Sequence, residues 1–213
     1  MEALATTDDS LLGGRVRLRQ PAQGYRVAID PVFLAAAIPA RPGSRILELG
    51  AGVGAASLCL AVRLPDVAIV GIELLEPVVE LARSNVHDNG LEGRVEMRRG
   101  DVLDSLRAAT FDHAMANPPY LEAGRGRRSP NALKDTAHIE GDAALQAWVE
   151  AAFRAVRPGG TVTFVHRPDR LAELAGLLSI GGGGMVVFPL WAKAGADATR
   201  VLVQSTKIGR AHV

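Results

Sequence analysis

The segment that decides the fold is LELGAGVGAAS, residues 47–57. An apolar strand pattern, SRILELG, leads into it, and an apolar helical pattern, VGAASLCLAVRL, leads out of it as far as Pro65. Between the two lie Gly50, Gly52 and Gly54, and glycine allows a tight turn whose backbone approaches a ligand closely. The start of the next helix adds N–H groups that lack intrahelical partners. The segment therefore predicts the first strand, binding loop and helix of an α/β fold.

The same alternation of strand and helix continues along the chain. Further strand patterns are VAIVGIE, RVEMRRGD, FDHAMAN and TVTFVHR. Further helical patterns are EPVVELARSNVHDNG, a weak one near residues 102–108, DAALQAWVEAAFRAVRPGG and PDRLAELAGLL. We expect the third of these helices to end at Pro158 and the glycines after it, and GGGG at 181–184 to form a loose turn. Alternating strands and helices predict a parallel sheet that is covered on both faces.

The last two strand patterns, MVVFPLW and TRVLVQST, have no helix between them and predict an antiparallel hairpin. The predicted fold is therefore a single-domain α/β structure, doubly wound around a mostly parallel seven-stranded sheet with a C-terminal antiparallel hairpin. Residues 44–213 would form this domain, and residues 1–43 an N-terminal segment with one strand and one helix. In that segment RVRLRQ places Arg15, Arg17 and Arg19 on one face of the strand.

Composition sets broad limits on function. The chain has 213 residues, of which 48% are apolar and 22% charged, and a formal net charge of +1. No global field would therefore attract nucleic acid, and local basic patches would have to do so. The single cysteine, Cys59, excludes an internal disulfide framework and a cysteine metal cluster. The polar, acidic start and the lack of a long apolar run predict a soluble cytoplasmic protein with no membrane association. We also expect no bound metal.

The glycine loop alone also fits a dinucleotide site. Residues 50–55 satisfy G-x-G-x-x-G/A, and Glu73 follows Gly50 by 23 residues. Two features weigh against NAD. Glu48 precedes the loop by two residues and would face the ligand, where it suits a cationic ammonium better than a pyrophosphate. No second domain or hydride-transfer constellation is evident.

Three acids end successive predicted strands, namely Glu48, Glu73 and Asp101. In open α/β sheets ligands bind at the carboxyl ends of the strands, near the topological switch point. Glu73 would hold ribose hydroxyls. Asp101 would either accept from an adenine amino group or cap the next helix, and these alternatives remain open.

The fourth sheet strand is followed by NPPY, which comprises Asn117, Pro118, Pro119 and Tyr120. Two prolines fix two φ angles and remove two backbone donors, so the segment is a rigid elbow. A proline turn capped by Asn117 is the plain structural alternative.

With this motif in place, ELGAGVG, GIE, GDV and NPPY in this order resemble a class I S-adenosylmethionine-dependent methyltransferase of the amino-methylating branch. The resemblance implies a Rossmann-like methyltransferase fold, S-adenosyl-L-methionine as cofactor, and transfer of its methyl group to a planar nitrogen. It also implies that the Asn117 side chain lies at the cofactor and that its oxygen, with the Pro118 carbonyl, accepts hydrogen bonds from the amino group. Tyr120 would stack on the base.

Upstream, QPAQGYRVAIDPVFLAA resembles the segment that precedes the sheet in bacterial tRNA1(Val) adenine-37 N6-methyltransferases. The resemblance implies a tRNA substrate, methylation of adenine N6, and a segment folded over the cofactor. Tyr25 and Arg26 would meet base or phosphate. Asp30 would lie near the methionyl end, or else only cap its helix.

Arg125, Arg127 and Arg128 follow the motif and would neutralise phosphates, unless the loop 121–141 is simply solvated. Other readings also remain open: a different planar amine as acceptor (protein glutamine, another nucleobase or a small molecule), a catalytically silent RNA-binding module, or an NAD-linked oxidoreductase.

Overall fold

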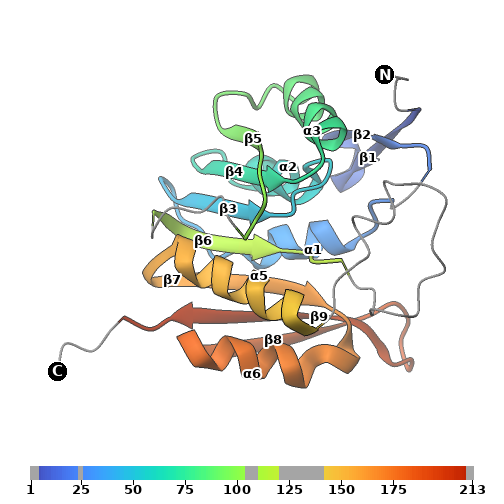
Figure 1. Cartoon of the computed structure of the whole chain (residues 1–213). Helices are drawn as coiled ribbons and strands as arrows, with labels where there is room; N and C mark the ends of the chain where they lie inside the picture. The colour runs from blue at the N-terminus through green and yellow to red at the C-terminus, as the bar shows by residue number, and fades with distance from the viewer. Residues whose placement is uncertain (1–4, 24–25, 104–109, 120–141, 210–213) are drawn as a thin grey trace.

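A seven-stranded sheet forms the centre of the molecule (Figure 1). The computed structural model describes residues 5–23, 26–103, 110–119 and 142–209. The strand order is β5-β4-β3-β6-β7-β9-β8. The strands are, along the chain, β3 Arg45–Leu49, β4 Ala68–Glu73, β5 Val95–Arg99, β6 Phe111–Ala116, β7 Val156–His166, β8 Gly182–Trp191 and β9 Ala198–Lys207. Strands β3 to β7 are mutually parallel, and β9 is antiparallel to both β7 and β8. The predicted mostly parallel sheet with a C-terminal hairpin is confirmed.

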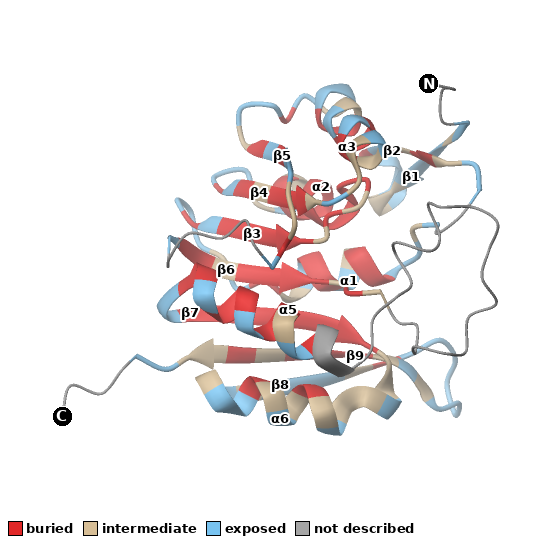
Figure 2. Ribbon diagram, in the orientation of Figure 1, coloured by how far each residue is buried: buried red, intermediate tan, exposed pale blue. Residues whose placement is uncertain are grey.

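Helices cover both faces of this sheet, as predicted. They are α1 Asp30–Ala37, α2 Ala55–Arg63, α3 Glu76–Asp88, α5 Asp142–Ala155 and α6 Leu171–Gly181. In Figure 1, α5 and α6 lie in front of the sheet, and α1 and α2 lie behind it. Two apolar cores result, one that includes side chains of α1, α2 and α3 and one that includes side chains of α5 and α6. Figure 2 shows buried residues concentrated along β3, β6 and β7, because central parallel strands have no solvent face.

Two predicted boundaries are wrong. Helix α5 ends at Ala155, before Pro158, because Val156 already pairs with Phe111 of β6. The four glycines at 181–184 form no loose turn: α6 runs to Gly181, and β8 begins at Gly182. A Cβ on Gly182 would stand 2.2 Å from Ser205 Oγ and 2.8 Å from Phe153 Cζ. At this position glycine is required for close packing.

The N-terminal segment forms a separate two-stranded sheet of β1 Thr6–Leu11 and β2 Val16–Pro21, which are joined by a short 3₁₀ turn at Leu12–Gly14. Only β2 was predicted. The β1 sequence, TTDDSL, has no alternation of apolar and polar residues and too few apolar residues to indicate a strand. The sequence prediction of arginines on one face of β2 agrees with its burial, since Val16 and Leu18 are buried and Arg17 is exposed.

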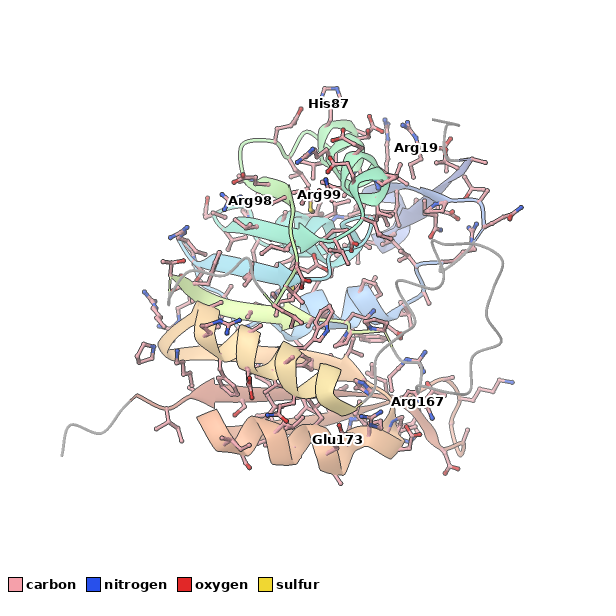
Figure 3. The ribbon with its side chains drawn as sticks, viewed as in Figure 1. Arg19, His87, Arg98, Arg99, Arg167 and Glu173 are labelled. Atoms are coloured by element: carbon pink, nitrogen blue, oxygen red, sulfur yellow. The ribbon has the colours of Figure 1, made fainter. Side chains whose placement is uncertain are left out.

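Helix α3 holds the hairpin through two asparagines. Asn85 and Asn89 lie one helical turn apart, and their side-chain amides bind the backbone N–H and C=O of Arg19 and Arg17, respectively. The two amides thus take the place of a neighbouring strand. Figure 3 shows Arg19 beside α3, where its guanidinium also lies 3.1 Å from the Asp88 carboxylate.

None of the helices in the described ranges has the length and apolar character that crossing a bilayer requires. The expectation of a cytoplasmic location is not tested by the structure. Within the same ranges, no group of three or more His, Cys, Asp or Glu side chains is arranged to hold a metal ion.

Candidate cofactor and active site

The glycine loop and the NPPY motif begin side by side. Strands β3 and β6 are parallel neighbours, and Leu49 pairs with Ala116 at their carboxyl ends. The next residues are Gly50 and Asn117, which are 67 positions apart in sequence. Because the chain runs from β3 outward to β5 and then returns to the other side of β3, this junction is the topological switch point of the sheet, where ligands bind in such folds.

The three glycines of the loop all have positive φ, namely 64° at Gly50, 53° at Gly52 and 86° at Gly54. These values lie in the left-handed region that glycine adopts without strain. The loop conformation therefore depends on glycine at each position. A side chain at these positions would strain the backbone whether or not a ligand is bound.

The space around the three glycines differs. A Cβ on Gly50 would overlap the ring of Trp148, at 2.5 Å from Cη2, and a Cβ on Gly54 would meet Met97 Cε at 2.8 Å. A Cβ on Gly52 would have no described atom within 4 Å. The loop is therefore packed below Gly50 and Gly54 and open above Gly52, which fits a ligand that lies against the backbone there. The sequence reasoning did not identify Trp148, because nothing in its own segment links it to the loop.

Glu73 closes one side of this open space from the end of β4. Its Oε2 accepts a hydrogen bond of 3.0 Å from the Gly52 N–H. Its Oε1 accepts from the backbone N–H groups of Leu74 at 2.9 Å and Leu75 at 3.1 Å. The carboxylate is thus fixed beside Gly52, where the sequence placed a ribose-binding acid.

Glu48 binds the first turn of α2. Its side chain is buried, and Oε2 accepts hydrogen bonds from the Ser57 backbone N–H, at 3.0 Å, and from the Ser57 hydroxyl. Gly54 is the N-cap residue of α2 and has no side chain, so Glu48 caps this helix from β3. Burial raises the pKa of Glu48 to about 7, against the lowering effect of the Ser57 hydrogen bonds, and the nearby Glu73 raises it as well. Its contact with a cofactor stays a prediction.

Asp101 follows β5, and its Oδ1 accepts a 2.9 Å hydrogen bond from the Leu103 N–H. This bond forms a local turn. The weak helix expected near 102–108 falls largely on residues 104–109, which lie outside the described residues. Capping and adenine binding therefore both remain open for Asp101.

Within the NPPY motif, Asn117 and Pro119 are half-buried and Pro118 is buried. Tyr120 lies outside the described residues, as do Tyr25 and all of 121–141, which includes Arg125, Arg127 and Arg128. The roles predicted for these side chains stay predictions.

Two side chains of the N-terminal segment with predicted roles make contacts within the protein. The Arg26 guanidinium lies 2.7 Å from the Asp9 carboxylate and 3.0 Å from the Thr7 hydroxyl. Asp30 has no N-cap hydrogen bond, since it is already the first residue of α1, and its carboxylate lies 2.9 Å from Arg200 Nε. The capping alternative for Asp30 is therefore wrong.

His166 is a further residue of this edge that the sequence reasoning missed. It ends β7, two residues after Phe164, which pairs with Ala116, the last residue of β6; Pro118 likewise lies two residues after Ala116. The His166 side chain is buried, and Nδ1 accepts a 2.9 Å hydrogen bond from the Arg167 N–H. Burial and then Arg170 lower its pKa to about 4, so the imidazole is neutral at pH 7. The only signal in the sequence is a histidine at the end of an apolar strand.

Comparison with known proteins identifies the family of the chain. Residues 26–174 match the family described as Methyltransferase small domain. The tRNA1(Val) (adenine(37)-N6)-methyltransferase of Tolumonas auensis is 30% identical over 158 residues, which cover 74% of this chain and 65% of that protein. The protein of the same name from Aeromonas salmonicida is 29% identical over 181 residues, which cover 84% of this chain and 75% of that protein.

A solved structure of a predicted O-methyltransferase from Agrobacterium tumefaciens has a TM-score of 0.70 and 26% identity, and the match covers 85% of this chain and 82% of that chain. With 65%, 66% and 64% of their lengths matched, the chain spans slightly less than two thirds of several of its curated relatives. Fold, loop and family match lead to one conclusion: the chain belongs to the Methyltransferase small domain family of class I S-adenosylmethionine-dependent methyltransferases.

Proposed function

We propose that this chain is an S-adenosylmethionine-dependent N-methyltransferase that methylates the exocyclic N6 of an adenine in tRNA. The observation that carries the proposal is the register of β3 against β6, which brings the first glycine of the loop beside Asn117. A cofactor held by the loop would then present its methyl group to the motif.

The residues present fit the cofactor. Part of the cofactor would lie against the backbone in the open space at Gly52. Glu73, already fixed beside Gly52, would hold the ribose hydroxyls. Glu48 would lie nearest the methionyl ammonium, and Asp101 nearest the adenine amino group. S-adenosylmethionine would supply an electrophilic methyl group on a sulfonium.

The motif would act on the acceptor. An exocyclic amino nitrogen shares its lone pair with the ring and must lose part of that conjugation before it attacks. The Asn117 side-chain oxygen and the Pro118 carbonyl would accept hydrogen bonds from its two hydrogens and favour this change. Pro118 and Pro119 would hold both acceptors in place, which is the preorganisation that lowers barriers. Tyr120 would stack on the base. No general base is needed, since the proton can leave after transfer.

The choice of tRNA rests on the names of the relatives, which are tRNA methyltransferases. Arg125, Arg127 and Arg128, just after the motif, would neutralise phosphates near the site. Residues 1–43 would cover the cofactor, and Tyr25 would contact the base or a phosphate. Arg26, already paired with Asp9, would have to exchange that partner to do the same.

The test is transfer of a radiolabelled methyl group to bulk tRNA, followed by nucleoside analysis. We expect label in N6-methyladenosine. Label only in protein or in another nucleoside would contradict the adenine assignment and leave the cofactor assignment intact. Calorimetry with S-adenosylhomocysteine and with NAD distinguishes the methyltransferase from an oxidoreductase.

Asn117→Ala tests the role of the motif. We expect the turnover number to fall by about 10²- to 10³-fold, as for loss of one preorganised hydrogen-bonding group. Binding of S-adenosylhomocysteine and of tRNA should persist. Asn89→Ala, at an asparagine far from the motif, is the control. Unchanged turnover in Asn117→Ala would sink the site assignment, and absence of any transfer by the wild type would favour a silent RNA-binding module.

A further inference from the structure

Asn85 connects the N-terminal hairpin to the glycine loop. It is 1% exposed, and each of its polar side-chain atoms has a partner. Oδ1 accepts from the Arg19 N–H at 2.8 Å, while Nδ2 donates to the Arg19 carbonyl at 2.8 Å and to the Val53 carbonyl at 3.0 Å. One buried amide thus joins β2, α3 and the centre of the loop.

Asn89 makes the same clamp without the link to the loop. Its Oδ1 accepts from the Arg17 N–H at 2.9 Å, and Nδ2 donates to the Arg17 carbonyl at 2.7 Å. The remaining bond of Nδ2 goes to the backbone carbonyl of Asn85, at 2.7 Å, in the last turn of α3, which Asn89 follows directly. The protein therefore contains two asparagines with the same clamp, of which only Asn85 contacts Val53; Asn85 is also buried, whereas Asn89 is half-buried at the end of α3.

The Val53 carbonyl is a point at which the loop needs support. Gly52 and Gly54 flank this residue, and glycine adopts either sign of φ at little cost, so the peptide planes here can rotate more readily than elsewhere. A buried hydrogen bond from Asn85 holds the Val53–Gly54 peptide in one orientation. That orientation belongs to the same loop whose Gly52 N–H is held by Glu73 on the other side.

We propose that Asn85 is a positioning residue that couples the order of the hairpin to the order of the cofactor loop. The backbone of β2 at Arg19 holds the Asn85 amide in place, and Asn85 holds the loop in its binding conformation. Cofactor bound to the loop in turn stabilises β2 at Arg19, since coupling between two sites is reciprocal. A polyanion that orders β2 at Arg19 would therefore raise affinity for the cofactor. The statements about cofactor rest on the function proposed above, whereas the link between hairpin and loop does not.

Asn85→Asp and Asn89→Asp form the test pair. Aspartate keeps the shape of the asparagine side chain and an acceptor for the N–H of β2. It loses the Nδ2 donor and places a carboxylate next to the carbonyl oxygens that Nδ2 bound. Both variants weaken the clamp on the hairpin, so both melting temperatures should fall, that of Asn85→Asp further because its carboxylate is buried. In NMR spectra without ligand, the amide signals of Gly52 and Gly54 should shift or broaden in Asn85→Asp and stay in place in Asn89→Asp. Unchanged glycine signals in Asn85→Asp would overturn the proposal.

Calorimetry with S-adenosylhomocysteine gives the second measurement. We expect Asn85→Asp to raise Kd by about fivefold or more, in the range of typical coupling, and Asn89→Asp to leave it within about twofold. Equal losses in both variants would mean that general destabilisation is the cause, and the proposal would fail. Absence of binding by the wild type would instead refute the proposed function, and the ligand-free glycine signals would still decide on Asn85.

Should Asn85→Asp fail to fold, the wild type provides the comparison. Saturating S-adenosylhomocysteine should slow hydrogen exchange of the Arg19 amide, which Asn85 binds, more than that of the Arg17 amide, which Asn89 binds. Equal protection of the two amides would contradict the coupling.

Discussion

Glu48 carries a carboxyl group that the fold removes almost entirely from water. It is 4% exposed, and its hydrogen-bonding partner among the described residues is Ser57, which the first turn of α2 presents to it. Burial disfavours the charged form more than these bonds favour it, so the pKa rises to about 7. The protonation state of the residue under the glycine loop therefore changes within the physiological range.

This pKa predicts a dependence of stability on pH. The folded protein binds a proton at Glu48 more tightly than the unfolded chain, so the contribution to stability is complete below pH 4.5 and is lost as the pH rises through about 7. Glu48→Gln resembles the protonated acid and removes this loss. Its free energy of unfolding relative to wild type should increase from pH 5 to pH 8 by up to about 3 kcal/mol. Urea denaturation at four pH values measures it, and a pH-independent difference would contradict the prediction.

The sequence predicted where Glu48, Glu73 and the three glycines lie, because strand ends and glycine spacing are local signals. It did not predict which way the Glu48 carboxylate turns. That direction depends on Gly54, an N-cap residue without a side chain, and on Ser57, nine residues after Glu48. Glu48 meets the start of this helix only after the strand and the helix have packed.

The passage from α6 to β8 shows how an element boundary depends on packing. GGGG has no side chains to indicate a helix or a strand, so the sequence suggests a loop. In the structure the first glycine ends a helix and the second begins a strand against Phe153 and Ser205. The reason for glycine here lies in a neighbouring strand and helix that no local pattern reveals.

Two glycine substitutions test this difference. At Gly182 a Cβ would stand 2.2 Å from Ser205 Oγ and 3.1 Å from the backbone oxygen of Leu178, so Gly182→Ala should destabilise the protein by about 1–3 kcal/mol. Gly176, in the exposed part of α6, has open space, and Gly176→Ala should stabilise by about 0.5–1 kcal/mol through helix propensity. Chemical denaturation of both variants is the measurement. If both substitutions changed the free energy of unfolding in the same direction, the packing around each glycine would not determine the effect of its substitution.

At the scale of the whole molecule, the N-terminal segment and the C-terminal hairpin hold one another. The buried Asp30 carboxylate, on α1, pairs with Arg200 of β9 across 170 positions of sequence. Gln204 of β9 also donates a 3.0 Å hydrogen bond to the carbonyl of Ala37 at the end of α1. This face of the hairpin is therefore completed by residues that precede the sheet in the chain.

Removing Arg200 should leave Asp30 buried without its ionic partner. Because the arginine side chain is 31% exposed, we expect Arg200→Ala to cost about 2–3 kcal/mol, at or below the range for breaking a buried pair. Asp30→Asn in the same background should restore part of that loss, since it removes the uncompensated charge. A double-mutant cycle by urea denaturation measures the coupling. Additive effects would show that the two side chains do not interact.

Strand and helix order could be predicted for the sheet because each element carries its own periodicity. The β1 strand and the clamp of Asn85 and Asn89 could not. TTDDSL becomes a strand only because β2 pairs with it, and an asparagine on a helix does not reveal that its amide will pair with a strand 66 positions away.

The two tryptophans of the chain lie in opposite surroundings: the ring of Trp148 lies under Gly50, and Trp191 is 57% exposed on the hairpin. Replacing Trp191 with phenylalanine would leave one tryptophan, and it would be the one in contact with the glycine loop. The emission wavelength and lifetime of Trp148 would then report movement of that loop in real time. The protein thus contains an optical probe at the junction of its two signature motifs, and no dye or label has to be attached.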